Sequence, residues 1–86
     1  MFTVYAIFNF IKDKIYIGHT SKLPERINRH NGLLKNKKKS YTSKNKGEWH
    51  LVYKEEFETR KEAIKRESEL KSYQGRQFIK RLIKKD

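Results

Sequence analysis

The chain of 86 residues is long enough for one domain, residues 1–86, and at this size only about 60% of the surface exposed in the unfolded chain can be buried. Hydrophobic residues at 35% and charged residues at 37% imply a small core, while aromatic residues at 13% argue against a disordered chain. A net charge of +12 attracts phosphate backbones, and the absence of cysteine excludes disulfides, iron–sulfur clusters and thiol nucleophiles. Nucleic acid is therefore the expected partner, and a reducing cytoplasm the expected location.

The first predicted element is a strand over residues 2–9, where β-branched and aromatic residues predominate. This apolar opening has no basic leader or cleavage site, and no stretch approaches the roughly 18 apolar residues that cross a bilayer, so we expect a soluble protein with no membrane partner. Turn chemistry at residues 12–14 and a return of the β pattern at 15–18 predict an antiparallel hairpin. Gly18 is expected to end its second strand.

A helix is predicted to follow this hairpin, because Thr20 or Ser21 can cap it and Pro24 suits its first turn. Residues at helical spacing extend the pattern over about three turns: they are Leu23, Ile27, Asn31 and Leu34. Residues 35–47 are basic and polar, which predicts a loop. Alternation over residues 49–54 then predicts a third strand.

The last third of the chain is predicted to be helical. Thr59 and Glu62 form a capping-box pattern at the start of a helix that runs to about Tyr73, and Gly75 is placed to end it. A short final helix is patterned by Phe78, Ile79, Leu82 and Ile83. The predicted order is β-β-α-β-α-α, an α+β fold with a small three-stranded antiparallel sheet flanked by helices.

Glu67 is the most informative position in the predicted second helix. Helical spacing places it in the middle of an inward stripe formed by Ala63, Ile64, Leu70 and Lys71. A buried lone carboxylate is costly unless it is paired or holds a metal. Helix geometry alone favours an ion pair with an arginine or lysine over metal ligation.

Four further side chains combine donors and acceptors suited to a phosphate. Arg26 and His30 lie four residues apart on one side of the first helix, although a pair of this kind taken alone favours a solvated helix face over a site. Tyr5 and Tyr16 occupy one hairpin strand each, where a tyrosine is usually a core aromatic. In a basic site, however, surrounding cations are expected to lower the tyrosine pKa, so that a phenol can accept a proton from water.

These residues together resemble the GIY-YIG nuclease family over nearly the whole chain. The resemblance is carried by Thr3-Val4-Tyr5, Lys14-Ile15-Tyr16-Ile17-Gly18, Arg26, His30 and the helix around Glu67. The chain most resembles stand-alone, single-domain bacterial members, which are related to the N-terminal nuclease domain of the excision-repair incision subunit. The first motif departs from the family pattern, because it has no glycine and has valine in place of isoleucine.

The resemblance implies an endonuclease that hydrolyses phosphodiester bonds, with DNA as the expected substrate. One divalent cation, Mg²⁺ or Mn²⁺, would be held by Glu67 together with the scissile phosphate and water. Tyr5 would be the general base, and Tyr16 would hold the attacking water or the phosphate. Arg26 would neutralise phosphoryl charge with assistance from His30, while Lys14 and Lys71 would be lesser phosphate contacts.

The loop at residues 35–47 is a candidate nucleic-acid contact, in which one aromatic ring can stack on a base. Its candidate residues are Lys35, Lys37, Lys38, Lys39, Tyr41, Lys44 and Lys46. A mobile solvated loop is the alternative for this segment. For the whole chain the alternatives are a non-catalytic DNA- or RNA-binding module and, less well supported, a structural protein of a ribosome-like assembly.

Overall fold

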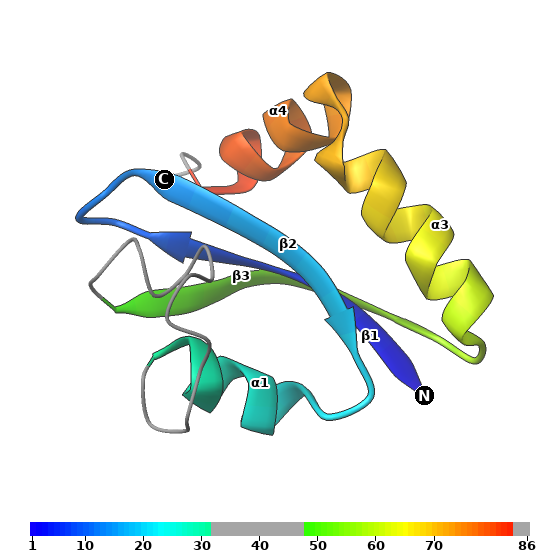
Figure 1. Ribbon diagram of the computed structural model, residues 1–86. Coiled ribbons are helices and arrows are strands. Elements are labelled where there is room, and N and C mark those ends of the chain that lie inside the picture. Colours follow the sequence, from blue (N-terminus) through cyan, green and yellow to red (C-terminus); the bar gives the residue numbers. More distant parts are fainter. Residues whose placement is uncertain (32–47, 84–86) are drawn as a thin grey trace.

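The computed structural model describes residues 1–31 and 48–83, which include a three-stranded sheet. Figure 1 shows helices on both sides of this sheet. The elements in chain order are β1 (Phe2–Asn9), β2 (Lys14–Thr20), α1 (Leu23–His30), β3 (Trp49–Phe57), α3 (Arg60–Lys71) and α4 (Tyr73–Ile83). The sheet is antiparallel with strand order β2-β1-β3, so β1 is central. The predicted α+β fold and its element order are confirmed.

The turn that connects β1 to β2 is held by hydrogen bonds to the side chain of Asn9. The Asn9 carboxamide oxygen accepts the backbone N–H groups of Ile11 and Lys12, each at 3.0 Å, and Asp13 adopts a positive φ of 55°. Asparagine at the start of a turn and aspartate in the left-handed region are the residue types that tolerate this geometry. The prediction that Gly18 ends β2 is wrong, since the strand continues to Thr20 and Gly18 pairs with Tyr5 inside it.

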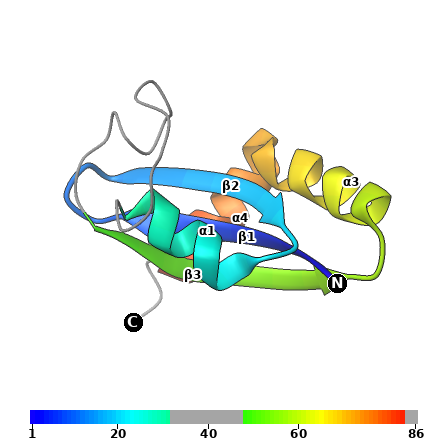
Figure 2. The same cartoon turned by 60° about the horizontal axis from the view of Figure 1, so that its bottom comes forward.

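Alternation along β1 divides its side chains between the two faces of the sheet. Val4, Ala6 and Phe8 pack toward α3 and α4 in one hydrophobic cluster. Tyr5 and Ile7 face the other way, where α1 covers the sheet. Figure 2 shows α1 on the side opposite α3 and α4. The central strand is therefore buried on both faces, as its continuous apolar run predicts.

A bulge in β3 reverses which of its residues point to each face. Ile7 pairs with Leu51 but Ala6 pairs with Tyr53, so Val52 is the extra residue at the register shift. Trp49 consequently packs in the α1-side cluster, whereas Tyr53 packs on the α3 side. Simple alternation over residues 49–54 does not anticipate this change.

The ends of α1 are secured by side chains. The Thr20 hydroxyl accepts the backbone N–H of Lys22 at 3.0 Å, just before the helix begins. After the helix, the Asn31 carboxamide bonds both backbone groups of Trp49, accepting its N–H at 2.6 Å and donating to its carbonyl at 3.1 Å. Asn31 therefore ties the end of α1 to the start of β3. The predicted helical position Leu34 lies outside the described residues.

Helix α3 begins with the predicted capping box, because the Thr59 hydroxyl accepts the N–H of Glu62 while the Glu62 carboxylate accepts the N–H of Thr59. Ala63 and Leu70 are buried as predicted. Ile64 is 50% exposed, so its assignment to the inward stripe is wrong. In the described residues no helix is long and apolar enough to cross a membrane.

The junction between α3 and α4 differs from the prediction. Helix α3 ends at Lys71 rather than Tyr73, because Ser72 turns the chain. The Ser72 hydroxyl donates to the Glu69 carbonyl at 2.6 Å and accepts the N–H of Gly75 at 3.2 Å. Gly75 lies within α4, where a Cβ atom would meet the Glu69 carbonyl oxygen at 2.4 Å. This glycine permits close approach of the two helices and does not terminate α3.

Candidate active site

Two strand tyrosines and two side chains of α1 meet on the α1 face of the sheet. We call Tyr5, Tyr16, Arg26 and His30 the tyrosine cluster. The hydroxyl oxygen of Tyr5 lies 2.8 Å from Nε2 of His30, and the Tyr5 side chain is fully buried. The Tyr16 ring centroid lies 4.7 Å from that of His30 and 6.2 Å from that of Tyr5. The structure therefore brings together all four of these predicted site residues.

Gly18 makes room for this cluster. It is the cross-strand partner of Tyr5, and a Cβ atom there would lie 3.1 Å from the Tyr5 hydroxyl oxygen and 3.0 Å from Cε2 of Tyr16. Such contacts are tighter than ordinary van der Waals packing. A residue with a side chain would displace the Tyr5 hydroxyl, so the glycine is required by the position of that group rather than by the end of a strand.

Arg26 reaches the tyrosine hydroxyls from α1. Hydrogen bonding to Tyr5 raises the pKa of Arg26 above its ordinary value, although burial acts in the opposite direction. Its Nε atom is buried and has no hydrogen-bond partner among the described residues. An unmet donor that water cannot reach costs about 1–3 kcal/mol. This unmet donor is a cost that the tyrosine cluster bears in order to hold the guanidinium at the tyrosine hydroxyls.

The pKa of Tyr5 is raised, whereas the sequence led us to expect that nearby cations would lower it. Burial is the largest influence and raises the pKa of Tyr5 to about 12, even though the hydrogen bond from Arg26 lowers it. The charges of Tyr16 and Glu67 also oppose a phenolate. At neutral pH the Tyr5 hydroxyl therefore carries its proton, and desolvation outweighs the neighbouring arginine.

Glu67 lies on the α3 side of the sheet with its side chain 17% exposed. One carboxylate oxygen contacts Nδ1 of His19, and the other lies 2.6 Å from Nζ of Lys71. Burial acts to raise the pKa of Glu67, but the hydrogen bonds from Lys71 and His19 together hold it below its ordinary value. The predicted pairing of this carboxylate with a lysine is confirmed, with a histidine as its second partner.

His19 is the site residue that the sequence interpretation missed. Nη1 of Arg60 lies 3.3 Å from Nε2 of His19, so Nε2 accepts from the guanidinium and Nδ1 carries the hydrogen that faces Glu67. The sequence signal that could have found it was strand alternation. His19 is two residues from Ile17, so both side chains lie on the face of the sheet that packs against α3.

Adjacent residues of the edge strand β2 connect the two halves of the site. Gly18 leaves space for the Tyr5 hydroxyl on one face, and His19 contacts Glu67 on the other. The charge of Glu67 makes the smallest of the contributions that raise the pKa of Tyr5. The candidate active site therefore lies around one exposed edge of the sheet, with acidic and phenolic groups approaching from opposite faces.

A divalent cation at this site would have one carboxylate ligand from the described residues, Glu67. Within residues 1–31 and 48–83 no three His, Asp or Glu side chains form a metal-binding group. Mg²⁺ retains several waters and binds through few carboxylates plus substrate phosphate, so Glu67 alone fits a site that phosphate and water complete. Such a site requires the carboxylate to exchange Lys71 or His19 for the cation.

The remaining predicted contacts do not join the tyrosine cluster. Lys71 is engaged with Glu67, while Lys14 lines a cavity beside α4. The predicted loop contacts lie outside the described residues: these are Lys35, Lys37, Lys38, Lys39, Tyr41, Lys44 and Lys46.

This fold and site agree with the comparison against known families, in which the GIY-YIG catalytic domain matches residues 1–80. The chain belongs to the GIY-YIG family and is a nuclease-family protein. It is 41% identical over 70 residues to UPF0213 proteins of Staphylococcus aureus strains Mu3, N315 and USA300, and these matches cover 81% of this chain and 79% of each relative. The names of these relatives state no activity. No solved structure gives a significant match.

Proposed function

We propose that this protein is an endonuclease that hydrolyses phosphodiester bonds in DNA, with Glu67 holding one Mg²⁺ or Mn²⁺ ion. The observation that carries the proposal is the meeting of Tyr5, Tyr16, Arg26 and His30 at a buried hydroxyl, with Glu67 at the same edge of β2. The two tyrosines and the glutamate lie far apart in sequence, and family membership adds that the fold belongs to nucleases. A bound divalent cation supplies positive charge to the phosphoryl oxygens.

Proton transfer is assigned to the Tyr5 and His30 pair. Because the pKa of Tyr5 is raised to about 12, a free phenolate is scarce at neutral pH. In the tautomer with hydrogen on Nδ1, His30 accepts a hydrogen bond from the Tyr5 hydroxyl at Nε2. The proton of the attacking water passes to the Tyr5 oxygen while the Tyr5 proton passes to Nε2. The pair then acts as one general base, and no phenolate needs to form beforehand.

Arg26 is assigned to the charge that develops on the phosphoryl group. Its guanidinium already lies at the tyrosine hydroxyls, where a phosphate bound beside them would meet its positive charge. A preorganised cation in a site with little water stabilises developing charge more strongly than it does in bulk solvent. Tyr16, beside the His30 ring, orients the water or the phosphate.

The test is cleavage of supercoiled plasmid, branched DNA and single strands, with and without Mn²⁺. We expect metal-dependent nicking that Glu67→Gln abolishes while DNA binding is retained, because the amide keeps the shape and loses the charge. Glu69→Gln is the matched control, since Glu69 lies on the same helix and its carboxylate bonds only an exposed part of Arg66. Full activity in Glu67→Gln would contradict the assignment.

A second candidate is a non-catalytic nucleic-acid-binding module with the nuclease fold. The observation in its favour is that both oxygens of Glu67 already contact protein groups, Lys71 and His19. This alternative predicts salt-sensitive binding without cleavage at any Mn²⁺ concentration. Loss of the ion pair with Lys71 lowers the melting temperature of Glu67→Gln under both candidates, so cleavage, and not stability, distinguishes them.

A further inference from the structure

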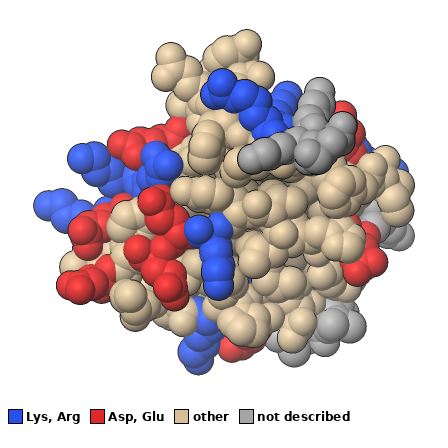
Figure 3. Space-filling view, turned by 180° about the vertical axis from the view of Figure 1, so that it is seen from behind, with Lys and Arg blue, Asp and Glu red and all other residues tan. Residues whose placement is uncertain are grey.

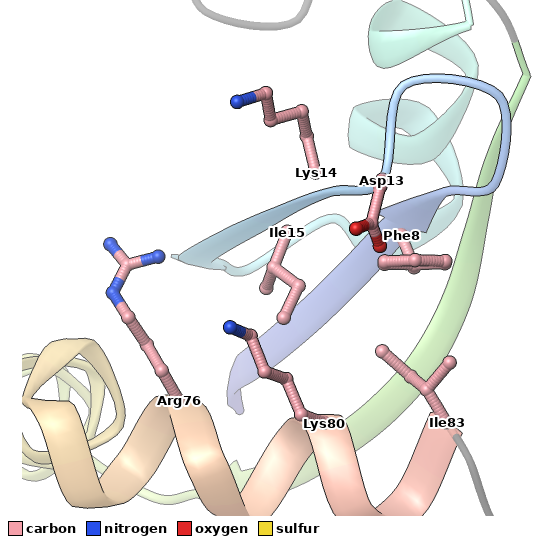
Figure 4. Close-up of a pocket in the computed structure, with 7 residues that line it drawn as sticks. All are labelled: Phe8, Asp13, Lys14, Ile15, Arg76, Lys80 and Ile83. Atoms are coloured by element: carbon pink, nitrogen blue, oxygen red, sulfur yellow. The ribbon is translucent and has the colours of Figure 1, made fainter.

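A cavity of about 290 Å³ lies between the β1–β2 hairpin and α4, apart from the tyrosine cluster. We call it the α4 groove. It is lined by Phe8, Asp13, Lys14, Ile15, Arg76, Lys80 and Ile83. Figure 4 shows Ile15 extending from the hairpin toward α4, where Arg76 and Lys80 lie, while the amino group of Lys14 points to the other side of β2. Its volume is near the lower bound of ordinary small-ligand sites, about 300 Å³.

The cationic groups of the α4 groove are available to a ligand. In the described parts of the chain Lys14, Arg76 and Lys80 form no ion pair, and Nε of Arg76 donates a hydrogen bond to the Lys71 carbonyl at 3.2 Å. That bond positions the guanidinium and leaves both terminal nitrogens for an anion. Arg76 and Lys80 are four residues apart on α4, so they share a helix face.

The distribution of charge singles out α4. Residues 55–69 contain six acidic and four basic residues, whereas α4 contains three basic and no acidic residues. On the α3 side the cations are offset, as in the ion pair of Arg66 with Glu55 at 2.8 Å. Figure 3 shows acidic and basic side chains interspersed over the region where α3 lies. The groove is therefore a place where positive charge is uncompensated.

The apolar wall and the single carboxylate narrow the class of ligand. Phe8, Ile15 and Ile83 offer carbon surface that a bare phosphate ion does not use. Asp13 opposes a second negative charge but accepts hydrogen bonds from a sugar hydroxyl or a base amine. A nucleotide combines a phosphate, a flat or apolar body and such donors. Its chemistry matches the three kinds of surface found here.

We propose that the α4 groove binds one nucleotide, with its phosphate at Arg76 and Lys80 and its sugar or base against Ile15 and Ile83. The source is a nucleotide of a bound strand or a free mononucleotide, which share this chemistry. This inference deepens the proposed function, because it assigns a second position at which the substrate strand binds. It rests on the proposed function in one respect: a nuclease makes a bound DNA strand the favoured source of the nucleotide.

The probes are a short single-stranded DNA, dAMP and inorganic phosphate, each added to protein labelled at isoleucine methyl groups. We expect the DNA to shift the methyl resonances of Ile15 and Ile83. The double variant Arg76→Gln with Lys80→Gln should remove these shifts and weaken DNA binding about tenfold, the loss of one charged hydrogen bond. The slope of log affinity against log salt should fall by roughly 0.7 for each phosphate that the variant no longer neutralises.

The matched control is Lys61→Gln with Lys65→Gln, which removes the same charge at the same spacing from exposed positions of α3. Equal losses of affinity in the two double variants would overturn the proposal, because the effect would then be one of net charge. Unshifted Ile15 and Ile83 with all three probes would also overturn it. Shifts that dAMP produces as strongly as DNA would support the groove and identify a free nucleotide as its source.

Thermal melting checks that both double variants remain folded. Cleavage is not measured in this experiment, so its failure leaves the proposed endonuclease activity standing. A wild-type protein that fills the groove but cuts no substrate would instead contradict the nuclease activity alone.

Discussion

The two faces of the sheet are built from alternate residues of the same strands, yet they bury different kinds of atoms. On the α3 and α4 face, Val4, Ala6 and Ile17 pack with aliphatic residues of the helices. On the α1 face, Tyr5 is equally buried but carries a hydroxyl bonded to His30. Carbon burial stabilises the fold, whereas polar burial costs free energy unless each group is bonded. Strand alternation therefore separates the tyrosine cluster from the aliphatic core, and among the described residues only Glu67 and His19 belong to the candidate site on the α3 side.

The largest effect is expected on the stabilising face. Leu70→Ala should lower the free energy of unfolding by about 2–5 kcal/mol, because Leu70 is 1% exposed and its removal leaves a cavity against the sheet. Urea unfolding measures this change, and Leu82→Ala, at a 38% exposed position of α4, should cost much less. Turnover by the folded fraction at saturating DNA should remain near the wild-type rate. A fall in turnover without a fall in stability would break the separation of the two faces.

The next effect lies on the chemical face. Tyr5→Phe keeps the packed ring but removes the hydroxyl, so we expect cleavage to fall by roughly 100-fold or more. The stability cost should not exceed about 1–3 kcal/mol, the cost of leaving one hydrogen-bond partner unsatisfied. Tyr53→Phe is the control, since that hydroxyl bonds Glu55 on the opposite face. A Tyr5→Phe protein that cuts at the wild-type rate would remove this hydroxyl from the mechanism.

The pH dependence of cleavage sharpens the role of Tyr5. A raised pKa of about 12 means that the phenolate fraction is small at pH 7 and grows about tenfold with each pH unit until pH 12. If a preformed phenolate were the base, the rate would rise roughly 100-fold between pH 7 and pH 9. Transfer through His30 predicts a smaller rise. Single-turnover rates at saturating metal and DNA distinguish the two, and a sustained tenfold rise per unit would contradict the relay.

The smallest expected loss of activity comes from adding a methyl group at a glycine, and Gly18 and Gly75 can be compared. Gly18→Ala should move the Tyr5 hydroxyl by a few tenths of an ångström, and since a 1 Å error costs about 100-fold we expect roughly a tenfold loss of rate. Gly75→Ala should act on stability instead, by about 1–3 kcal/mol or more, because its Cβ meets backbone atoms of α3. Melting temperatures and turnover rates of both variants check that Gly18→Ala affects mainly the rate and Gly75→Ala mainly the stability. Equal effects on both quantities would argue that the faces are coupled.

Local patterns were sufficient to predict most of the fold. The hairpin, the capping box at Thr59 and the order of elements follow from turn residues, alternation and helical spacing, which act over a few residues. The role of Gly75 could not be predicted from those signals. A glycine beyond a helix usually ends it, and only the packed structure shows that α4 approaches the backbone of α3 there.

The candidate site was predicted unevenly for a similar reason. The clustering of Tyr5, Tyr16, Arg26 and His30 followed from a motif, but their electrostatics did not. The pKa of Tyr5 depends on how completely α1 covers it, which no spacing encodes. His19 escaped notice because a histidine on an edge strand has no partner until α3 is packed against it.

The bulge at Val52 allows Trp49 and Tyr53, which are four residues apart, to face opposite sides of the sheet. In an unbroken strand side chains alternate strictly, so two residues four apart would share a face. Removing Val52 would restore an unbroken pairing with β1 and leave Trp49 and Tyr53 opposite their present partners, on their present faces. The extra residue is therefore not needed for the pairing itself, and β3 can lose one residue at this point without turning either half over.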